Sequence, residues 1–354
     1  MGMTLAPAEA VREPFDEWEG ERSELLGRRI SEMGLSIKGS LVERLVEQLY
    51  AELGEKGMVF RPPVYLSDQW GCPDNTPIIG VPFYLADPKL SRIEEEIAVE
   101  VEGERDVMRY LRHEAGHAVN YAYRLHERPD WAVMFGSYLR PYRERFHADP
   151  FSREFVRHIL GWYAQKHPDE DFAETFAVWL TPGMDWRTDY AGWPALRKLD
   201  YVDRVMKEIG QQMAEVPAIS PDDLPVESMN YTIADHYKES TEALPIEDRR
   251  HFDGDLKNIF ALAVEAPQGE SASRFLARHR REVIGRIAYW TGETTIVVGA
   301  FIDFLIERNQ ELDLRVRGLE ASTIIELTAF GTAVMMRYRY NRKKRVPRRQ
   351  TESA

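Results

Sequence analysis

Residues 112–120 read "RHEAGHAVN", with two histidines four positions apart. On a helix of 3.6 residues per turn, His113 and His117 lie one turn apart on the same face, so both imidazoles can reach one cation. Glu114 projects about 100° away, close to a metal-activated water without being a ligand. The stretch predicts two metal ligands and a general base. The motif alone is suggestive, and the alternative is a helix with two partly buried histidines and a surface acid, so a third ligand is needed.

A third metal ligand has to come from another part of the chain. The pattern HExxHxxGxxH would supply it from the same helix, but Asn120 and Tyr123 stand where that pattern has glycine and histidine. That class is therefore excluded. The best candidate is Glu170 in "HPDEDFAETFAVW", and His167 in the same stretch is the alternative.

The candidate ligand Glu170 lies in a second predicted helix. The core-facing residues of that helix recur at helical spacing and are Phe172, Phe176 and Trp179. Glu170 and Glu174 stack one turn apart on a neighbouring face. One carboxylate can bind the metal, and the other can accept a hydrogen bond from a ligand histidine and fix its tautomer. Glu174 is thus expected to support the site from behind.

The combination of "HEAGH" with "EDFAETF" resembles the gluzincin metallopeptidases, whose third zinc ligand is a glutamate on a second helix. The spacing and the "FAE" core are similar to the branch that includes anthrax lethal factor. In that branch a tyrosine seven residues before the glutamate stabilises the oxyanion, and Tyr163 stands at this position here. Residues from about 60 to 205 also resemble a bacterial family described as putative zinc-binding metallopeptidases.

This resemblance implies a site and an activity. One zinc ion would be bound by His113, His117 and Glu170, with one coordination position left for water. Glu114 would act as general base and later deliver the proton to the leaving amine. Tyr163 would stabilise the oxyanion beside the metal. The implied reaction is hydrolysis of a peptide bond, and the same groups would also serve hydrolysis of another amide.

The order of predicted elements indicates an α+β fold. Residues 16–56 are expected to be helical, with leucines recurring every four residues in "LVERLVEQLYAEL". The β-prone, proline-punctuated segments 58–68 and 76–88 predict a small sheet, whose edge at residues 78–85 could pair with an extended peptide. The motif helix is expected from about Gly103 until Pro129 stops it. A zincin-like metallopeptidase domain with a small sheet and active-site helices is therefore expected, followed by an all-α region.

Proline content suggests where the domains divide, because three prolines fall within "VPAISPDDLPVES". The predicted parts are a metallopeptidase domain with a helical lead-in at residues 1–215, a Pro-rich linker at 216–228, a helical C-terminal domain at 229–340 and a basic tail at 341–354. The positive charge begins just before that tail, in "RYRYNRKKRVPRRQ". It could contact an acidic partner, and a solvated chain end is the alternative.

Composition limits which functions, metal sites and locations are compatible with the sequence. The chain has 354 residues and a formal net charge of −13, which disfavours dedicated nucleic-acid binding. Its one cysteine, Cys72, allows neither an internal disulfide nor a thiolate cluster, so a metal must be held by His, Asp and Glu. The acidic N-terminus lacks a secretory pattern, and no apolar run is long enough for a membrane span. A cytoplasmic location is expected.

Two function classes follow from the sequence. The first is a zinc metallopeptidase acting on a peptide or protein substrate. The second is a non-catalytic, zinc-containing scaffold that uses residues 229–340 and the basic tail for interactions. Glu114 favours the enzyme, because a purely structural zinc site has no need for a general base.

Overall fold

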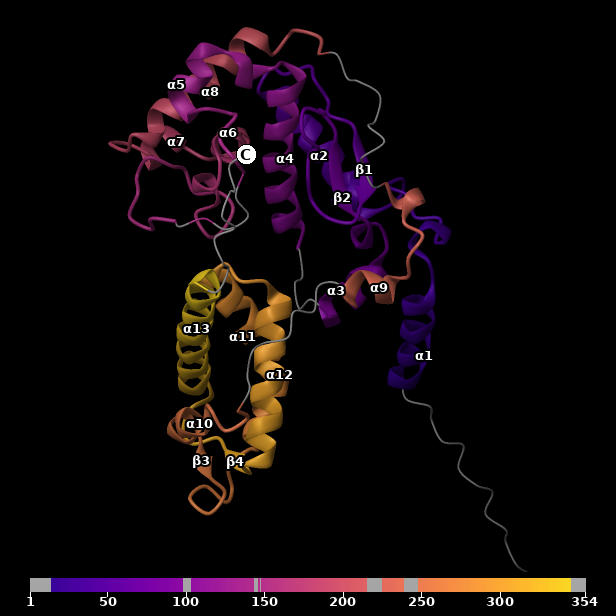
Figure 1. Ribbon diagram of the computed structural model, residues 1–354. Helices are drawn as coiled ribbons and strands as arrows, with labels where there is room; N and C mark the ends of the chain where they lie inside the picture. The colour runs from indigo at the N-terminus through magenta and orange to yellow at the C-terminus, as the bar shows by residue number, and fades with distance from the viewer. Residues whose placement is uncertain are drawn as a thin grey trace, which may run out of the picture.

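The computed structural model describes residues 14–97, 103–142, 146, 148–214, 225–238 and 248–344 (Figure 1). About 61% of the described residues are helical, with a small sheet and a helical C-terminal region. The expected α+β, metallopeptidase-like fold class is confirmed. Among the described residues, no helix is long and apolar enough to cross a bilayer.

The elements follow one another in two groups. The first group is α1 (Pro14–Gly27), η1 (Ile30–Glu32), α2 (Leu41–Glu55), β1 (Val64–Ser67), β2 (Ile79–Pro82), η2 (Phe83–Ala86), α3 (Pro88–Ile97), α4 (Glu104–Ala122), η3 (Leu125–Glu127), α5 (Pro129–Phe135), η4 (Tyr163–Gln165), α6 (Pro168–Leu180), α7 (Trp186–Asp189) and α8 (Ala195–Ile209). The second group is η5 (Val226–Ser228), α9 (Ile233–Lys238), α10 (Asp253–Ile259), β3 (Ala261–Leu262), α11 (Ala272–Thr291), α12 (Thr295–Glu311), β4 (Leu314–Arg315) and α13 (Glu320–Lys344).

The helical stretch expected over residues 16–56 is interrupted between α1 and α2, so that prediction was wrong in its middle. Gly34 and Gly39 take positive φ values of 66° and 81°, which suit glycine and are incompatible with a continuous helix. Ser40 then caps α2 by accepting a hydrogen bond from the Val42 N–H. Leu45, Leu49 and Leu53 of α2 are buried as expected from their spacing, and Leu41 is partly buried.

The motif helix α4 is shorter than predicted. It ends at Ala122, where Arg124 takes a left-handed conformation with φ 48°. Pro129 does not stop α4 but occupies the first turn of α5, a position where its missing N–H costs nothing.

The sheet of the first group is small and its outer edge is not free. β1 and β2 pair in parallel, with Val64 opposite Ile79. On the other side of β2, Gly80 donates to the Gly71 carbonyl at 2.7 Å and accepts from the Gly71 N–H at 3.3 Å. The strand ends at Pro82, which has no N–H to donate. This edge therefore offers little room for the peptide pairing that the sequence suggested.

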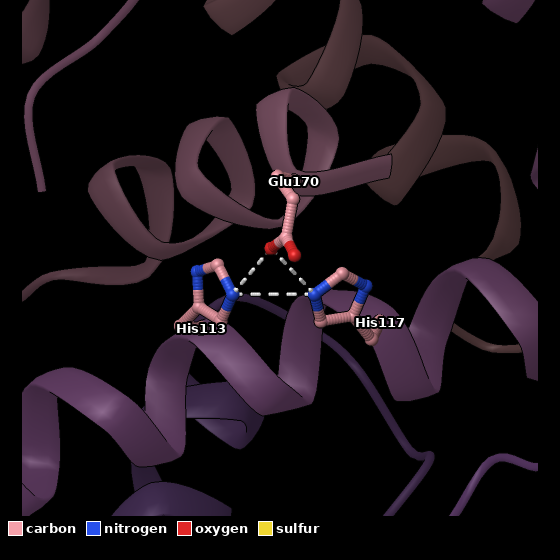
Figure 2. A group of neighbouring side chains, drawn as sticks. All are labelled: His113, His117 and Glu170. Atoms are coloured by element: carbon pink, nitrogen blue, oxygen red, sulfur yellow. Dashed lines mark hydrogen bonds and ion pairs between the residues drawn. The ribbon is translucent and has the colours of Figure 1, made fainter. Parts of the chain in front are cut away.

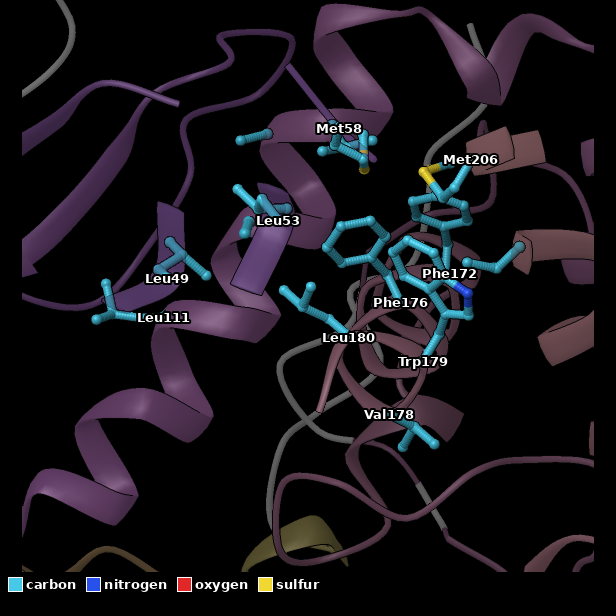
Figure 3. Close-up of a cluster of buried hydrophobic side chains, with 14 of the residues drawn as sticks. Leu49, Leu53, Met58, Leu111, Phe172, Phe176, Val178, Trp179, Leu180 and Met206 are labelled. Carbon is cyan, nitrogen blue, oxygen red and sulfur yellow. The ribbon is translucent and has the colours of Figure 1, made fainter. Parts of the chain in front are cut away.

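The central packing joins α4 to α6, which lie side by side in Figure 1. Gly116 makes the close approach possible, because a Cβ there would lie 2.7 Å from the Cα of Ala173 on α6. On the far side of α6, Phe172 and Phe176 enter the main hydrophobic core together with Leu53 of α2 (Figure 3). α4, which carries the two histidines, and α6, which carries Glu170, are thus held by the same hydrophobic core.

Two further cores organise the rest of the chain. η5 and α9 pack on the first group, because Val226 and Ile233 share a core with Phe83 and Leu90. α10 to α13 form a separate core with the short antiparallel pair β3–β4. Residues 216–224 of the expected linker lie outside the described residues, and the domain boundaries remain a prediction. α13 extends into the basic segment as far as Lys344, and the rest of the tail is outside the described residues.

Candidate metal centre

Helices α4 and α6 bring three potential ligands together (Figure 2). The Nε2 atoms of His113 and His117 lie 3.2 Å apart. Oε2 of Glu170 is 3.0 Å from His113 Nε2 and 3.2 Å from His117 Nε2. All three side chains are buried. The ligand set predicted from the sequence is therefore positioned to bind a metal ion.

The donor set fits zinc in size and in chemistry. With bonds of about 2.0–2.1 Å and tetrahedral angles, zinc ligands lie about 3.3 Å apart, close to the distances found here. The outer Nδ1 atoms of both rings face carboxylates, so each Nε2 directs a lone pair at Glu170 if Nδ1 carries the proton. Three acceptors at such short range repel one another unless a cation or protons lie between them. Two imidazoles and one carboxylate are a common zinc set with one open position.

Glu174 lies directly behind His113, one turn after Glu170 on α6. Its Oε1 accepts from His113 Nδ1 at 2.9 Å. Its Oε2 accepts from the backbone N–H groups of His158 at 3.2 Å and Ile159 at 2.8 Å. The fully buried carboxylate thus fixes the His113 ring and ties the loop before η4 to the metal centre.

Asp169 supports the other ligand histidine, a role that the sequence analysis missed. Its Oδ2 accepts from His117 Nδ1 at 2.8 Å and from the Tyr121 hydroxyl at 2.7 Å. Its Oδ1 accepts from Asn120 Nδ2 at 2.6 Å. Asn120 stands where the single-helix ligand pattern has glycine. Here it donates to Asp169 and so helps to hold the carboxylate that supports His117. The density of acids in "HPDED" was the available signal, but it does not show which acid faces α4.

Electrostatics couple the ligands tightly. Burial lowers the pKa of His113, but the hydrogen bonds to Glu170 and Glu174 outweigh this and raise it to about 9. Burial also lowers the pKa of His117, and Asp169 and Glu170 reverse the effect and raise it well above its ordinary value. Burial raises the pKa of Glu170, but the two histidines hold it well below its usual range. Glu170 is thus charged, and the site favours positive charge between its three potential ligands.

Glu114 lies next to the ligands in sequence but outside the ligand group. Its carboxyl is buried, and burial raises its pKa, although His113 and His117 partly offset this. Within the described part of the chain, no side chain or backbone group donates a hydrogen bond to it. A buried carboxyl that has a raised pKa and accepts no hydrogen bond from the protein is suited to exchanging protons with a water molecule.

Two tyrosines lie over the metal centre. The Tyr163 ring meets the His113 ring edge-on, with 5.6 Å between centroids, and its hydroxyl is 3.4 Å from Lys166 Nζ. Burial raises the pKa of Tyr163, so the phenol stays protonated. Tyr142 donates a hydrogen bond to Glu170 Oε1. Sequence analysis predicted Tyr163 near the site but gave no sign of Tyr142, which lies in an aperiodic segment.

Family comparison agrees with this geometry. Residues 86–204 match the model of a family described as putative zinc-binding metallo-peptidase. The matched range is about a third of the chain and contains α4, α6 and all three ligands. The resemblance to putative zinc-binding metallopeptidases seen in the sequence is confirmed for this range. No curated protein and no solved structure matches the chain.

The described histidines His158 and His167, near the HExxH motif, contact backbone groups instead of the potential ligands. His167, the alternative third ligand, uses Nε2 to donate to the Arg140 carbonyl at 2.7 Å and Nδ1 to accept from the Asp169 N–H at 3.2 Å. It caps α6 and is not among the residues positioned to hold a metal ion, so the structure favours Glu170 over this alternative. His158 contacts the Arg109 carbonyl through Nε2 at 3.0 Å. His147 lies outside the described residues.

Proposed function

We propose that the protein is a zinc-dependent peptidase of the gluzincin type, with one zinc ion bound by His113, His117 and Glu170. The proposal rests on the close approach of these three donors. Each of them also makes a hydrogen bond to a residue outside the ligand set. A support of this kind is typical of metal sites, where outer contacts orient the ligands. The family match over residues 86–204 supports both the metal and the reaction class.

The chain's own residues supply the proton transfers. Zinc, when bound, acts as a Lewis acid that polarises a carbonyl and lowers the pKa of a water ligand towards about 7. Glu114 takes a proton from the attacking water and passes it to the leaving amine. The pKa of Glu114 is raised and therefore lies closer to neutral pH. A carboxyl whose pKa is near the working pH can both accept and release a proton.

Tyr163 is proposed to donate a hydrogen bond to the oxyanion that forms on the substrate carbonyl. The phenol lies beside a ligand histidine, and its high pKa keeps the donor proton in place. Lys166 brings a positive charge within 3.4 Å of the same hydroxyl. A prearranged donor of this type contributes to catalysis because it interacts more strongly with the charged oxyanion than with the ground-state carbonyl.

The proposed substrate is a peptide or protein, and the proposed location is the cytoplasm. The basic residues from Arg337 onwards would contact an acidic partner. The alternative, a scaffold with a structural zinc, leaves the buried Glu114 without a purpose, and burying an unengaged carboxyl is costly.

Replacement of Glu114 by Gln tests the proposal. Zinc content is measured by elemental mass spectrometry, and hydrolysis is measured by mass spectrometry on a diverse peptide library. Glu114→Gln should keep one equivalent of zinc and lose cleavage, whereas His117→Ala and Glu170→Ala should lose both. Glu127→Gln, an exposed acid on η3, is the matched control and should behave as wild type. Zinc binding without cleavage in wild type would support the scaffold instead.

A further inference from the structure

The two carboxylate oxygens of Glu170 have different partners. Oε2 faces both ligand histidines, at 3.0 Å from His113 Nε2 and 3.2 Å from His117 Nε2. Oε1 instead accepts a hydrogen bond from the Tyr142 hydroxyl. The carboxylate is therefore divided between a metal-facing oxygen and an oxygen held by a phenol.

Tyr142 is held in this position by contacts outside the ligand set. Lys166 Nζ lies 4.5 Å from its ring centroid, and the His167 ring lies 5.4 Å away. Both neighbours immediately precede α6, the helix that carries Glu170. The contacts therefore tie the phenol to the start of the ligand helix, although about half of the Tyr142 side chain is exposed.

The division of the carboxylate matters for coordination. Three protein ligands that each give one atom leave the fourth tetrahedral position of zinc open. A carboxylate can also bind a cation through both oxygens, which raises the coordination number. An oxygen that already accepts a hydrogen bond from a phenol has less electron density to offer a metal, and the bond fixes the carboxylate plane.

We propose that Tyr142 is a positioning residue that keeps Glu170 a one-oxygen ligand and so preserves the open coordination position. The inference rests on the proposed metal site but not on peptidase activity. Tyr142 acts through Glu170, because its hydroxyl bonds to the oxygen that faces away from the histidines. It is therefore distinct from Tyr163, which is proposed to act on the substrate.

Tyr142→Phe removes the hydroxyl and keeps the ring packing. Tyr123→Phe is the matched control, because the Tyr123 hydroxyl donates to the Gln212 carbonyl rather than to the ligand set or its supports. Zinc affinity is measured by competition with a chelator. The protein is also loaded with cobalt(II), whose visible absorption is intense in four-coordinate sites and weaker in five-coordinate ones.

For Tyr142→Phe we expect a 10- to 100-fold loss of zinc affinity and a weaker cobalt absorption, with Tyr123→Phe unchanged. Wild-type affinity and absorption in Tyr142→Phe would overturn the inference. A phenolate charge-transfer band in the copper(II)-loaded wild type, lost in Tyr142→Phe, would also overturn it by making Tyr142 a ligand. Failure of the wild type to bind any of these metals would overturn the proposed metal site itself.

Discussion

Asp169 and Glu170 are neighbours in sequence, yet they hold the same histidine from opposite sides. Asp169 Oδ2 lies 2.8 Å from His117 Nδ1, and Glu170 Oε2 lies 3.2 Å from His117 Nε2. The first turn of α6 thus provides both one residue positioned to bind a metal ion and the support of another. The acids also lie where the helix dipole favours negative charge.

Asp169→Asn should weaken zinc binding by about 10- to 100-fold without removing a ligand. The carboxylate accepts from His117, Asn120 and Tyr121, and an amide has only one acceptor oxygen and adds two donors. His117 is then free to change tautomer or rotate. Chelator competition on the purified variant measures the effect. Asp189→Asn, on the exposed surface of α7, should bind zinc as wild type does. Equal affinity in both variants would contradict the role of Asp169.

Local periodicity explains why the sequence predicted the three ligands. His113, His117 and Glu170 stand on two helices whose faces follow from 3.6-residue spacing, and the family resemblance supplied their pairing. Tyr142 could not be found in this way, because it reaches Glu170 from an aperiodic segment between α5 and η4. Its contact depends on the path of the loop, which leaves no regular pattern in the sequence.

The same distinction applies to the fold. Apolar spacing identified α2 and α6, but it gave no sign of the break after α1, which depends on the φ angles of Gly34 and Gly39. Nor did it show that Gly71 covers the outer edge of β2, because this contact joins a loop to a strand through backbone groups alone. Backbone conformation at glycine and loop contacts are set by the assembled structure rather than by side-chain pattern.

Tyr163→Phe should lower kcat by about 10²- to 10³-fold while KM and zinc content change little. These values are typical for removal of one oxyanion donor. The interaction that is lost forms mainly in the transition state, so substrate binding should persist. Steady-state kinetics on a cleaved library peptide, with zinc measured in the same sample, provide the test. A rise in KM at constant kcat would instead make Tyr163 a substrate-binding residue.

The ion pair of Arg112 with Glu52 should contribute strongly to stability. It joins α4 to α2 through two bonds of 2.7 Å, with side-chain exposures of 12% and 6%. Arg112→Ala leaves a buried, unpaired carboxylate and should cost about 3–5 kcal/mol in the free energy of unfolding. Arg44 forms an exposed pair with Glu104 between the same two helices, so Arg44→Ala should cost far less, because water screens this pair. Chemical denaturation measures both, and similar costs would show that burial is not decisive here.

Gly116→Ala should disturb the metal centre through the contact between α4 and α6. The new Cβ would lie 2.7 Å from the Cα and 3.0 Å from the carbonyl oxygen of Ala173, both backbone atoms that cannot move without moving α6. Such overpacking costs about 1–3 kcal/mol, and the shift of α6 would displace Glu170 from the histidines. We therefore expect lower stability together with lower zinc affinity.

Gly285→Ala is the control for that substitution, because Gly285 also lies inside a helix, α11, but a Cβ there meets nothing within 4 Å. This change should stabilise the protein by up to about 1 kcal/mol and leave zinc binding unaltered. Chemical denaturation and chelator competition are measured on both variants. Gly285→Ala reports the effect of helix propensity alone, whereas Gly116→Ala adds the effect of the contact between α4 and α6. If Gly116→Ala were as stable as wild type and bound zinc equally well, α4 and α6 could not be in the close contact on which the ligand geometry depends.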